Sequence, residues 1–201
     1  MTVAVSGLAL LFGTILGFLL GILRSSNNKL LNWPIAVYVS VIRGTPFVVQ
    51  IFIVFFILPE WGIQLSAFPA AVLALTALGT AFICEIVAGG VKAVPRGQWE
   101  AAASSGLSVV QRLRFVIVPQ AMQTILPPLV GQYVLLIKDS SVVSVIGVTE
   151  LTRVGWLTVV RIPEGLMVFT LVGILYFVIS YPLIRVANAM EQKMAVREVR
   201  L

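Results

Sequence analysis

The sequence predicts an all-α integral membrane protein, built as one bundle of five transmembrane helices. Of the 201 residues, 59% are hydrophobic and only 11% are charged, whereas about a quarter of the residues of ordinary soluble domains are charged. The mean hydropathy of +1.05 agrees with this imbalance. A soluble domain of this size keeps too many residues in water to hide so much apolar surface. The composition therefore excludes a soluble enzyme or signalling domain.

Five segments have the length of about 20 mostly apolar residues that a spanning helix needs. They cover residues 2–23, 33–58, 68–91, 122–146 and 166–186, so that residues 1–201 form a single transmembrane domain. No basic residue precedes Arg24, so we expect the first segment to span the membrane and not to be a cleaved signal peptide. Its Gly13, Gly17 and Gly21 would let another helix approach closely, from this chain or from another subunit.

The Lys and Arg residues between the apolar segments predict the orientation. Two of them, Arg153 and Arg161, lie on one side of the predicted membrane. Ten lie on the other side: Arg24, Lys29, Lys92, Arg96, Arg112, Arg114, Arg185, Lys193, Arg197 and Arg200. Because basic loops stay in the cytoplasm, we expect the N-terminus outside and the C-terminus inside. The net charge of +6 is then a topology signal and does not indicate nucleic-acid binding.

The polar inventory excludes several kinds of chemistry. The chain has no His, which removes His-based catalysis and His metal ligands. Its one Cys, Cys84, lies in an apolar run and predicts a small buried thiol. No G-x-x-x-x-G-K-[ST] sequence is present, so the chain has no P-loop for ATP. Any uphill transport must draw its energy from a partner or an ion gradient.

The segment 94–120, between the third and fourth predicted spans, is neither apolar enough to span nor typical of a linker. Residues 99–105 favour a short Ala-rich helix, which Gly106 can end by taking a positive φ. Ser108–Gln111 form a capping box for a second, amphipathic helix, which Pro119 is expected to stop. Such a segment either docks into another protein or lies on the membrane, and the Ala-Gly element favours docking.

Particular motifs carry a family resemblance. The segment contains Glu100-Ala101-Ala102, then Gly106, and closes on Ile117-Val118-Pro119. In this order it resembles the EAA loop of the membrane subunits of binding-protein-dependent ATP-binding cassette importers. Residues 42–50 (I-R-G-T-P-F-V-V-Q), 93–100, 119–121 and 138–147 resemble stretches of the polar amino acid permease branch, and the resemblance extends to about Leu151. Ser40, Ala88 and Gly131 stand where the branch usually has Glu, Arg and Asn, which bears on the substrate and not on the class.

The resemblance implies a set of partners in the bacterial cytoplasmic (inner) membrane. Two permease subunits, identical or different, would sit on a dimer of ATP-binding subunits, and an extracytoplasmic solute-binding protein would deliver a polar amino acid. The chain would then be no enzyme and would hold no cofactor, because ATP and Mg would be bound by the ATPase partner. Its EAA loop would act as a coupling helix through Glu100, Ala101, Ala102 and Gly106, and the pathway would alternate between inward and outward access.

Four charged residues, Arg43, Glu85, Lys138 and Asp139, fall inside the predicted spans. Charges at this depth are costly and usually face a cavity or a partner. An amino acid carries both a carboxylate and an ammonium group, so a pathway could use both signs. Alternatively, the four charges pair with one another and hold the bundle together, and Arg43 marks a break in its helix. The candidate pathway residues are Arg43, Thr45, Glu85, Lys138, Asp139, Ser140 and Ser141.

An ion-gradient-driven secondary transporter or channel subunit is the alternative function. It would explain the spans and the intramembrane charges equally well, but it would not explain the EAA-type loop. A membrane scaffold that transports nothing is disfavoured by the charges within the spans.

Overall fold

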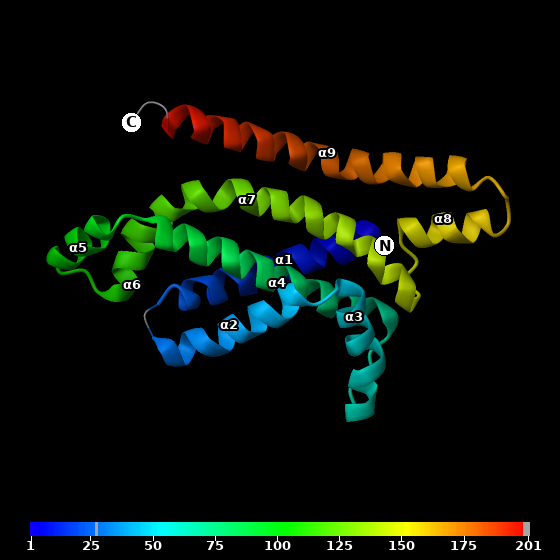
Figure 1. Ribbon diagram of the computed structural model, residues 1–201, viewed down its shortest axis with the longest axis horizontal. Coiled ribbons are helices and arrows are strands. Elements are labelled where there is room, and N and C mark those ends of the chain that lie inside the picture. The colour runs from blue at the N-terminus through cyan, green and yellow to red at the C-terminus, as the bar shows by residue number, and fades with distance from the viewer. Residues whose placement is uncertain (27, 199–201) are drawn as a thin grey trace.

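The computed structural model describes residues 1–26 and 28–198, with side chains up to Gln192. Every regular element in these residues is helical, which confirms the all-α prediction (Figure 1). Four helical stretches are long and apolar enough to cross a membrane, and a bent pair makes a fifth if it is one span. The four are α1 (Thr2–Arg24), α4 (Ala67–Ala93), the continuous stretch Val109–Ile146, and α9 (Gly165–Glu198), which is apolar to Gln192.

Helix α4 lies at the centre of the bundle, between α1 and α7 (Val118–Asp139) (Figure 1). The stripe of small residues on α1 packs against it: a Cβ at Gly17 would lie 2.6 Å from the Cβ of Ile83, and one at Gly21 would lie 2.6 Å from that of Val87. Close approach of these two helices therefore requires glycine. The stripe makes an intrachain contact, and Cys84 is buried in the same region as expected.

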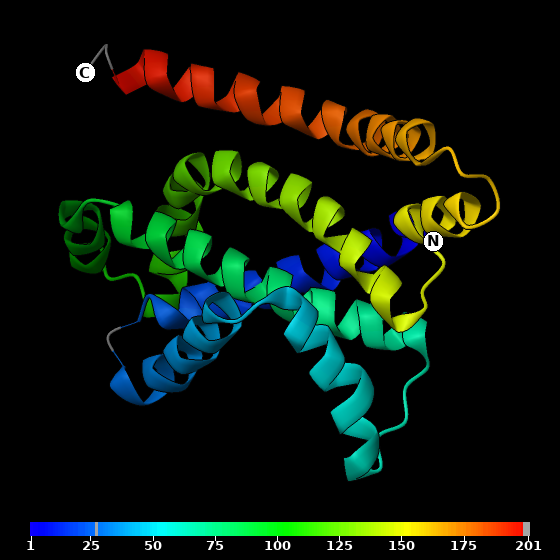
Figure 2. The same cartoon turned by 45° about the vertical axis from the view of Figure 1, so that its right-hand side comes forward.

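The second predicted span, 33–58, is not one straight helix. Helix α2 (Lys29–Gly44) ends at an elbow, and the chain continues as α3 (Phe47–Phe52), a π-helical turn (Ile53–Ile57) and a 3₁₀ turn (Leu58–Trp61). The two parts are bent by 108°. Thr45 and Pro46 are extended, because a residue before proline avoids the helical region. Figure 2 shows α3 and the turns after it directed away from the rest of the bundle as an arm.

The prediction that Pro119 ends a helix is wrong. Helix α6 (Val109–Arg112) continues through a π-helical turn (Leu113–Ile117) into α7 and a 3₁₀ turn (Ser140–Ile146). The N–H of Val118 bonds to the carbonyl of Leu113, five residues back. This wider turn changes the hydrogen-bond register just before the proline that has no N–H to donate. The helix therefore passes Pro119 without a break.

Two helices differ from the expected pattern near the C-terminus. Helix α8 (Leu151–Val159) was not predicted, and α9 is longer than the expected 166–186. Glu150 caps α8, because its two carboxylate oxygens accept the backbone N–H groups of Thr152 and Arg153 at 2.8 and 2.7 Å. Helix α9 packs on α7 and α8. However, only 6% of its most apolar 18-residue stretch is buried, compared with 67% of the corresponding stretch of α4.

Candidate coupling loop and transport pathway

The loop between α4 and α7 has the predicted helix–turn–helix form. Helix α5 (Arg96–Ser104) is followed by Gly106 at φ +76°, a conformation that glycine adopts at little cost. Ser108 and Gln111 form the predicted capping box at the start of α6. Figure 1 shows α5 and α6 at one end of the bundle, the end where α9 finishes, while the N-terminus and α8 lie at the other.

The four predicted coupling residues do not share one surface. Glu100, Ala101 and Gly106 are exposed, whereas Ala102 is only 5% exposed. Trp99 packs against the core formed by α4 and α7, and the amide of Gln98 accepts a hydrogen bond from Gln120 of α7 at 3.0 Å. Helix α5 is therefore attached to the bundle on its inner side and presents the outer side to solvent.

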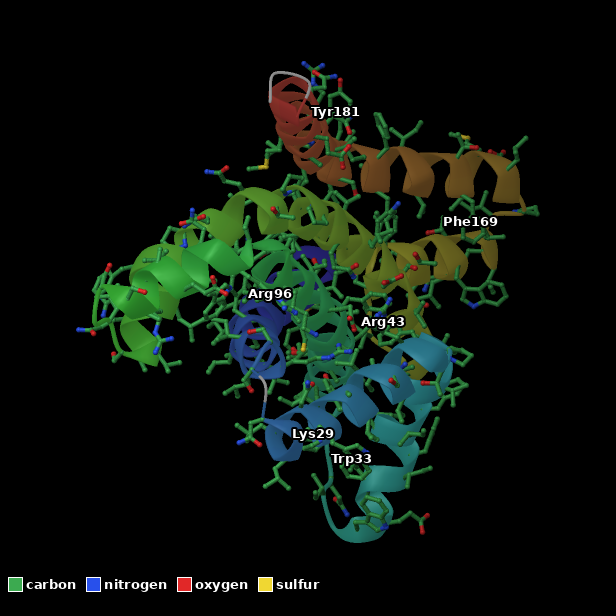
Figure 3. All side chains as sticks on the ribbon, turned by 60° about the vertical axis from the view of Figure 1, so that its left-hand side comes forward. Lys29, Trp33, Arg43, Arg96, Phe169 and Tyr181 are labelled. Atoms are coloured by element: carbon green, nitrogen blue, oxygen red, sulfur yellow. The ribbon has the colours of Figure 1, made fainter. Side chains whose placement is uncertain are left out.

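The carboxylate of Glu85 joins three helices. Its Oε2 accepts a hydrogen bond from Arg24, in the last turn of α1, and forms a salt bridge with Nη1 of Arg43 in α2 at 3.1 Å. The guanidinium of Arg43 also lies over the ring of Phe82, 5.4 Å from its centroid, which is within cation–π range. Figure 3 places Arg43 at the end of α2 that lies toward the middle of the molecule, away from Lys29 and Trp33.

Sequence reasoning placed Arg24 in a cytoplasmic loop and missed its role in this cluster. A signal was present, because Arg24 follows Gly21 by three residues and so continues the face that meets α4. The alternative that intramembrane charges pair with one another describes Arg43 and Glu85. The cluster holds two guanidinium groups and one carboxylate, and the side chain of Arg43 is 43% exposed.

Lys138, Asp139, Ser140 and Ser141 lie at a different depth. A Cβ at Gly79 would meet Leu136, and one at Gly90 would meet Ile125, so α4 and α7 run antiparallel. Residues 138 and 139 are therefore displaced from the level of Glu85 by roughly eight residues of α4, about 12 Å. No ion pair within the described residues joins Lys138 or Asp139 to any partner.

Two serine hydroxyls close to this second pair of charges, those of Ser140 and Ser144, are engaged locally. Ser140 is buried and donates to the carbonyl of Ile137 at 2.6 Å. Ser144 donates to the carbonyl of Ser141 at 2.8 Å. Hydroxyls in membrane helices often bond to their own backbone in this way.

Two polar residues that sequence reasoning did not single out are nearly fully buried. Glu150 is 1% exposed and accepts, besides the capping bonds, the hydroxyl of Tyr176 of α9 at 2.7 Å. Gln50 is 7% exposed and bonds across the α2–α3 elbow. Glu150 could not be found from the sequence, because it stands in a polar loop. Gln50 is the last residue of the motif at 42–50, which marked the segment but did not indicate a role for this side chain.

These features define a class: a helical membrane protein with paired charges within its spans and a helix–turn–helix at one end. The family follows from comparison with known proteins. Residues 13–196 match the family described as binding-protein-dependent transport system inner membrane component, and the chain belongs to this family. Membership favours an importer component over an ion-gradient-driven transporter or channel.

Individual relatives cover almost the whole chain. It is 36% identical over 194 residues to the L-cystine transport system permease protein TcyB of Bacillus subtilis (strain 168), covering 96% of this chain and 83% of TcyB. It is 37% identical over 193 residues to the probable glutamine ABC transporter permease protein GlnP of the same organism, covering 94% and 88%. A solved structure, described as an amino acid ABC transporter with histidines, matches with a TM-score of 0.85 at 32% identity, over 96% of this chain and 90% of that one.

Proposed function

We propose that this chain is the pathway-forming permease of an ATP-driven importer of polar amino acids. The single observation that carries the proposal is the solvent-facing helix, left-handed glycine and capped helix of residues 96–112. The relatives named for cystine and glutamine transport support the substrate class. Because the chain has no P-loop, an ATPase partner would hydrolyse the ATP.

The experiment is reconstitution of the permease with its ATP-binding subunit and solute-binding protein in vesicles, tested against a panel of amino acids. We expect one or a few polar amino acids to stimulate ATP hydrolysis and to accumulate inside the vesicles. Uptake by the permease alone, driven by an ion gradient and indifferent to ATP, would contradict the proposal and support a secondary transporter.

We infer the orientation from the basic residues. The α5–α6 end, which carries Arg96, Arg112 and Arg114, would face the cytoplasm, and the N-terminus would lie outside. In this orientation α5 can reach an ATPase subunit, while α8, at the opposite end, would face the solute-binding protein. A membrane-impermeant thiol reagent added from outside would test the assignment: it should label Ile63→Cys and should not label Arg96→Cys.

Within the loop we assign two kinds of role. Glu100 and Ala101 would form part of the surface that docks into the ATPase subunit, since both are exposed. Ala102 would seat the helix against the bundle, since it is buried. Gly106 would set the turn between the two helices. Movement of a docked α5 would reach α7 through the Gln98–Gln120 hydrogen bond and the packing of Trp99.

The pathway would contain the two charged clusters at different depths. Arg43 and Glu85, with Thr45 at the elbow, would form the cluster nearer the α5–α6 end. Lys138 and Asp139, with Ser140 and Ser141, would form the other. The excess guanidinium of the first cluster suits the carboxylate of an amino acid. The pathway would be completed by a second permease chain, identical or different, because a large part of α9 and of the α3 arm is uncovered in one chain.

A further inference from the structure

One buried amide bridges the elbow of the second span. Nε2 of Gln50, in α3, lies within hydrogen-bond distance of the carbonyl of Ile42 at 2.7 Å and of the carbonyl and hydroxyl of Thr45, both at 3.0 Å, and its two hydrogens serve these three oxygens. Gln50 is 7% exposed. Its side chain therefore connects the arm to the end of α2 without contact with bulk solvent.

The elbow needs such a donor because its backbone cannot supply one. The last carbonyls of a helix have no partner within the helix. Here Thr45 leaves the helix in an extended conformation and Pro46 has no N–H. Within a membrane an unpaired carbonyl is costly, since lipid offers no hydrogen-bond donor. Gln50 provides the missing donor from the next turn of chain.

The same bonds fix the position of Arg43. Arg43 lies between Ile42 and Thr45, the two residues whose carbonyls the amide holds. Its guanidinium then reaches Glu85 and lies over Phe82. A change of the elbow angle would move the backbone of Arg43 relative to α4. The elbow angle therefore sets the distance between the guanidinium of Arg43 and the carboxylate of Glu85.

The other end of the amide is unused in this conformation. Oε1 of Gln50 is buried and has no hydrogen-bond partner among the described residues. Buried side-chain oxygens in folded proteins are nearly always bonded. An unbonded oxygen next to the elbow argues against a purely structural role for Gln50, because a second position of the α3 arm could bring a hydrogen-bond donor to it.

We propose that Gln50 is a positioning residue that holds the α2–α3 elbow in its present angle and so keeps Arg43 paired with Glu85. When the elbow changes its angle, the pair separates and the guanidinium of Arg43 becomes available to the carboxylate of the substrate. This inference rests on the proposed function, in which Arg43 belongs to the pathway.

The elbow angle is measured first, and this measurement needs no transport. In full-length protein with Cys84→Ala, spin labels are attached at Leu30→Cys and Trp61→Cys, both highly exposed sites on the two sides of the elbow. Labelled protein is diluted with unlabelled protein, so that distances arise within one chain. We expect a single distance in this background and a broadened or second distance after Gln50→Leu. An unchanged distribution overturns the proposal.

Two further variants make this result specific. Gln64→Leu changes an exposed glutamine of the loop before α4, and we expect it to leave the distance unchanged. Gln50→Met keeps the approximate length of the side chain but has no hydrogen-bond donor, so we expect the same broadening as with leucine. If the leucine variant does not fold, the methionine variant decides the question.

The link to Arg43 is tested by uptake of an equimolar mixture of radiolabelled proteinogenic L-amino acids into vesicles that hold the complete transporter. We expect Gln50→Leu to reduce uptake roughly tenfold, as loss of one ordinary buried hydrogen-bonding partner allows. If Gln50 acts through Arg43, then Gln50→Leu adds no further loss in an Arg43→Gln background. Independent, additive losses overturn the link.

The two failures are distinguishable. If the unaltered transporter takes up none of the mixture, the proposed function fails, and the spin-label distances still decide whether Gln50 sets the elbow. If the unaltered transporter is active and Gln50→Leu has normal uptake and a normal distance, this inference alone fails.

Discussion

Helix α4 and the α2–α3 segment are both apolar, but they are held in different ways. Helix α4 is packed on several sides, with glycine contacts to α1 and side-chain contacts from α7 at Gly79 and Gly90. Helix α2 buries one residue, Val39, and α3 buries Gln50 and Ile51. Fewer buried apolar side chains hold α2–α3, so that polar bonds contribute a larger share of its attachment. We therefore expect damage to the packed frame to prevent folding, and damage to the polar bonds of α2–α3 to impair function in a folded protein.

The largest effect is expected within the packed frame. Gly21→Leu would place a side chain where even a Cβ lies 2.6 Å from the Cβ of Val87 and 2.9 Å from the carbonyl of Cys84. Overpacking of this kind costs about 3 kcal/mol or more when backbone must move. We expect little monodisperse protein after detergent extraction and a lower melting temperature. Gly7→Leu is the control, because nothing lies within 4 Å of that position, and an equal loss there would contradict the assignment.

A smaller effect on folding and a large effect on coupling are expected at Gly106. Its φ of +76° is tolerated by Asn and Asp at a modest cost, roughly 1 kcal/mol. Gly106→Asp also adds a charge to the exposed turn. We expect the protein to remain folded in the membrane and ATP hydrolysis to continue, while uptake per ATP falls strongly. Gly106→Asn adds a side chain of similar shape without the charge, and it should retain more transport than Gly106→Asp. Normal uptake by Gly106→Asp would remove Gly106 from the coupling surface.

An intermediate effect is expected at the ion cluster. Glu85→Gln removes the charge that Arg24 and Arg43 share and keeps the size of the side chain. Since the side chain of Glu85 is 39% exposed, we expect uptake to fall only about tenfold, at the lower end for a bond between charged groups. Assembly should be normal by size-exclusion chromatography. Glu60→Gln, at an exposed site, is the control. Wild-type uptake by Glu85→Gln would reduce Glu85 to a structural role.

The sequence predicted the parts of the fold that depend on near neighbours. The capping box of Ser108 and Gln111 and the positive φ of Gly106 each involve only a few consecutive residues. The four continuous candidate spans follow from apolar segments of sufficient length. Pro119 misled for the same reason, because the local rule for proline took no account of a π-helical turn that absorbs the missing donor.

The parts that could not be predicted depend on residues distant in the sequence. Arg24 and Glu85 are 61 residues apart, and Tyr176 and Glu150 are 26 apart. Their meeting is set by which helices become neighbours, and hydropathy carries no information on that. The candidate pathway residues fall into two groups for this reason. Arg43 and Glu85 come together, whereas Lys138 and Asp139 of α7 lie at a depth about two turns of α4 away from Glu85.

The smallest effect is expected at the buried polar contact between α8 and α9, which can belong either to the packed frame or to the parts that move. Tyr176→Phe removes one hydroxyl and leaves Glu150 its two backbone donors. Because the carboxylate keeps most of its bonds, we expect a loss of about 1 kcal/mol in stability and nearly normal uptake. Tyr181→Phe, on the exposed side of the same helix, should change neither quantity. Thermal unfolding in detergent measures the first effect, and vesicle uptake measures the second. A strong loss of uptake by Tyr176→Phe in a stable protein would place this contact with the elbow, as a part that moves during transport, and not with the packed frame.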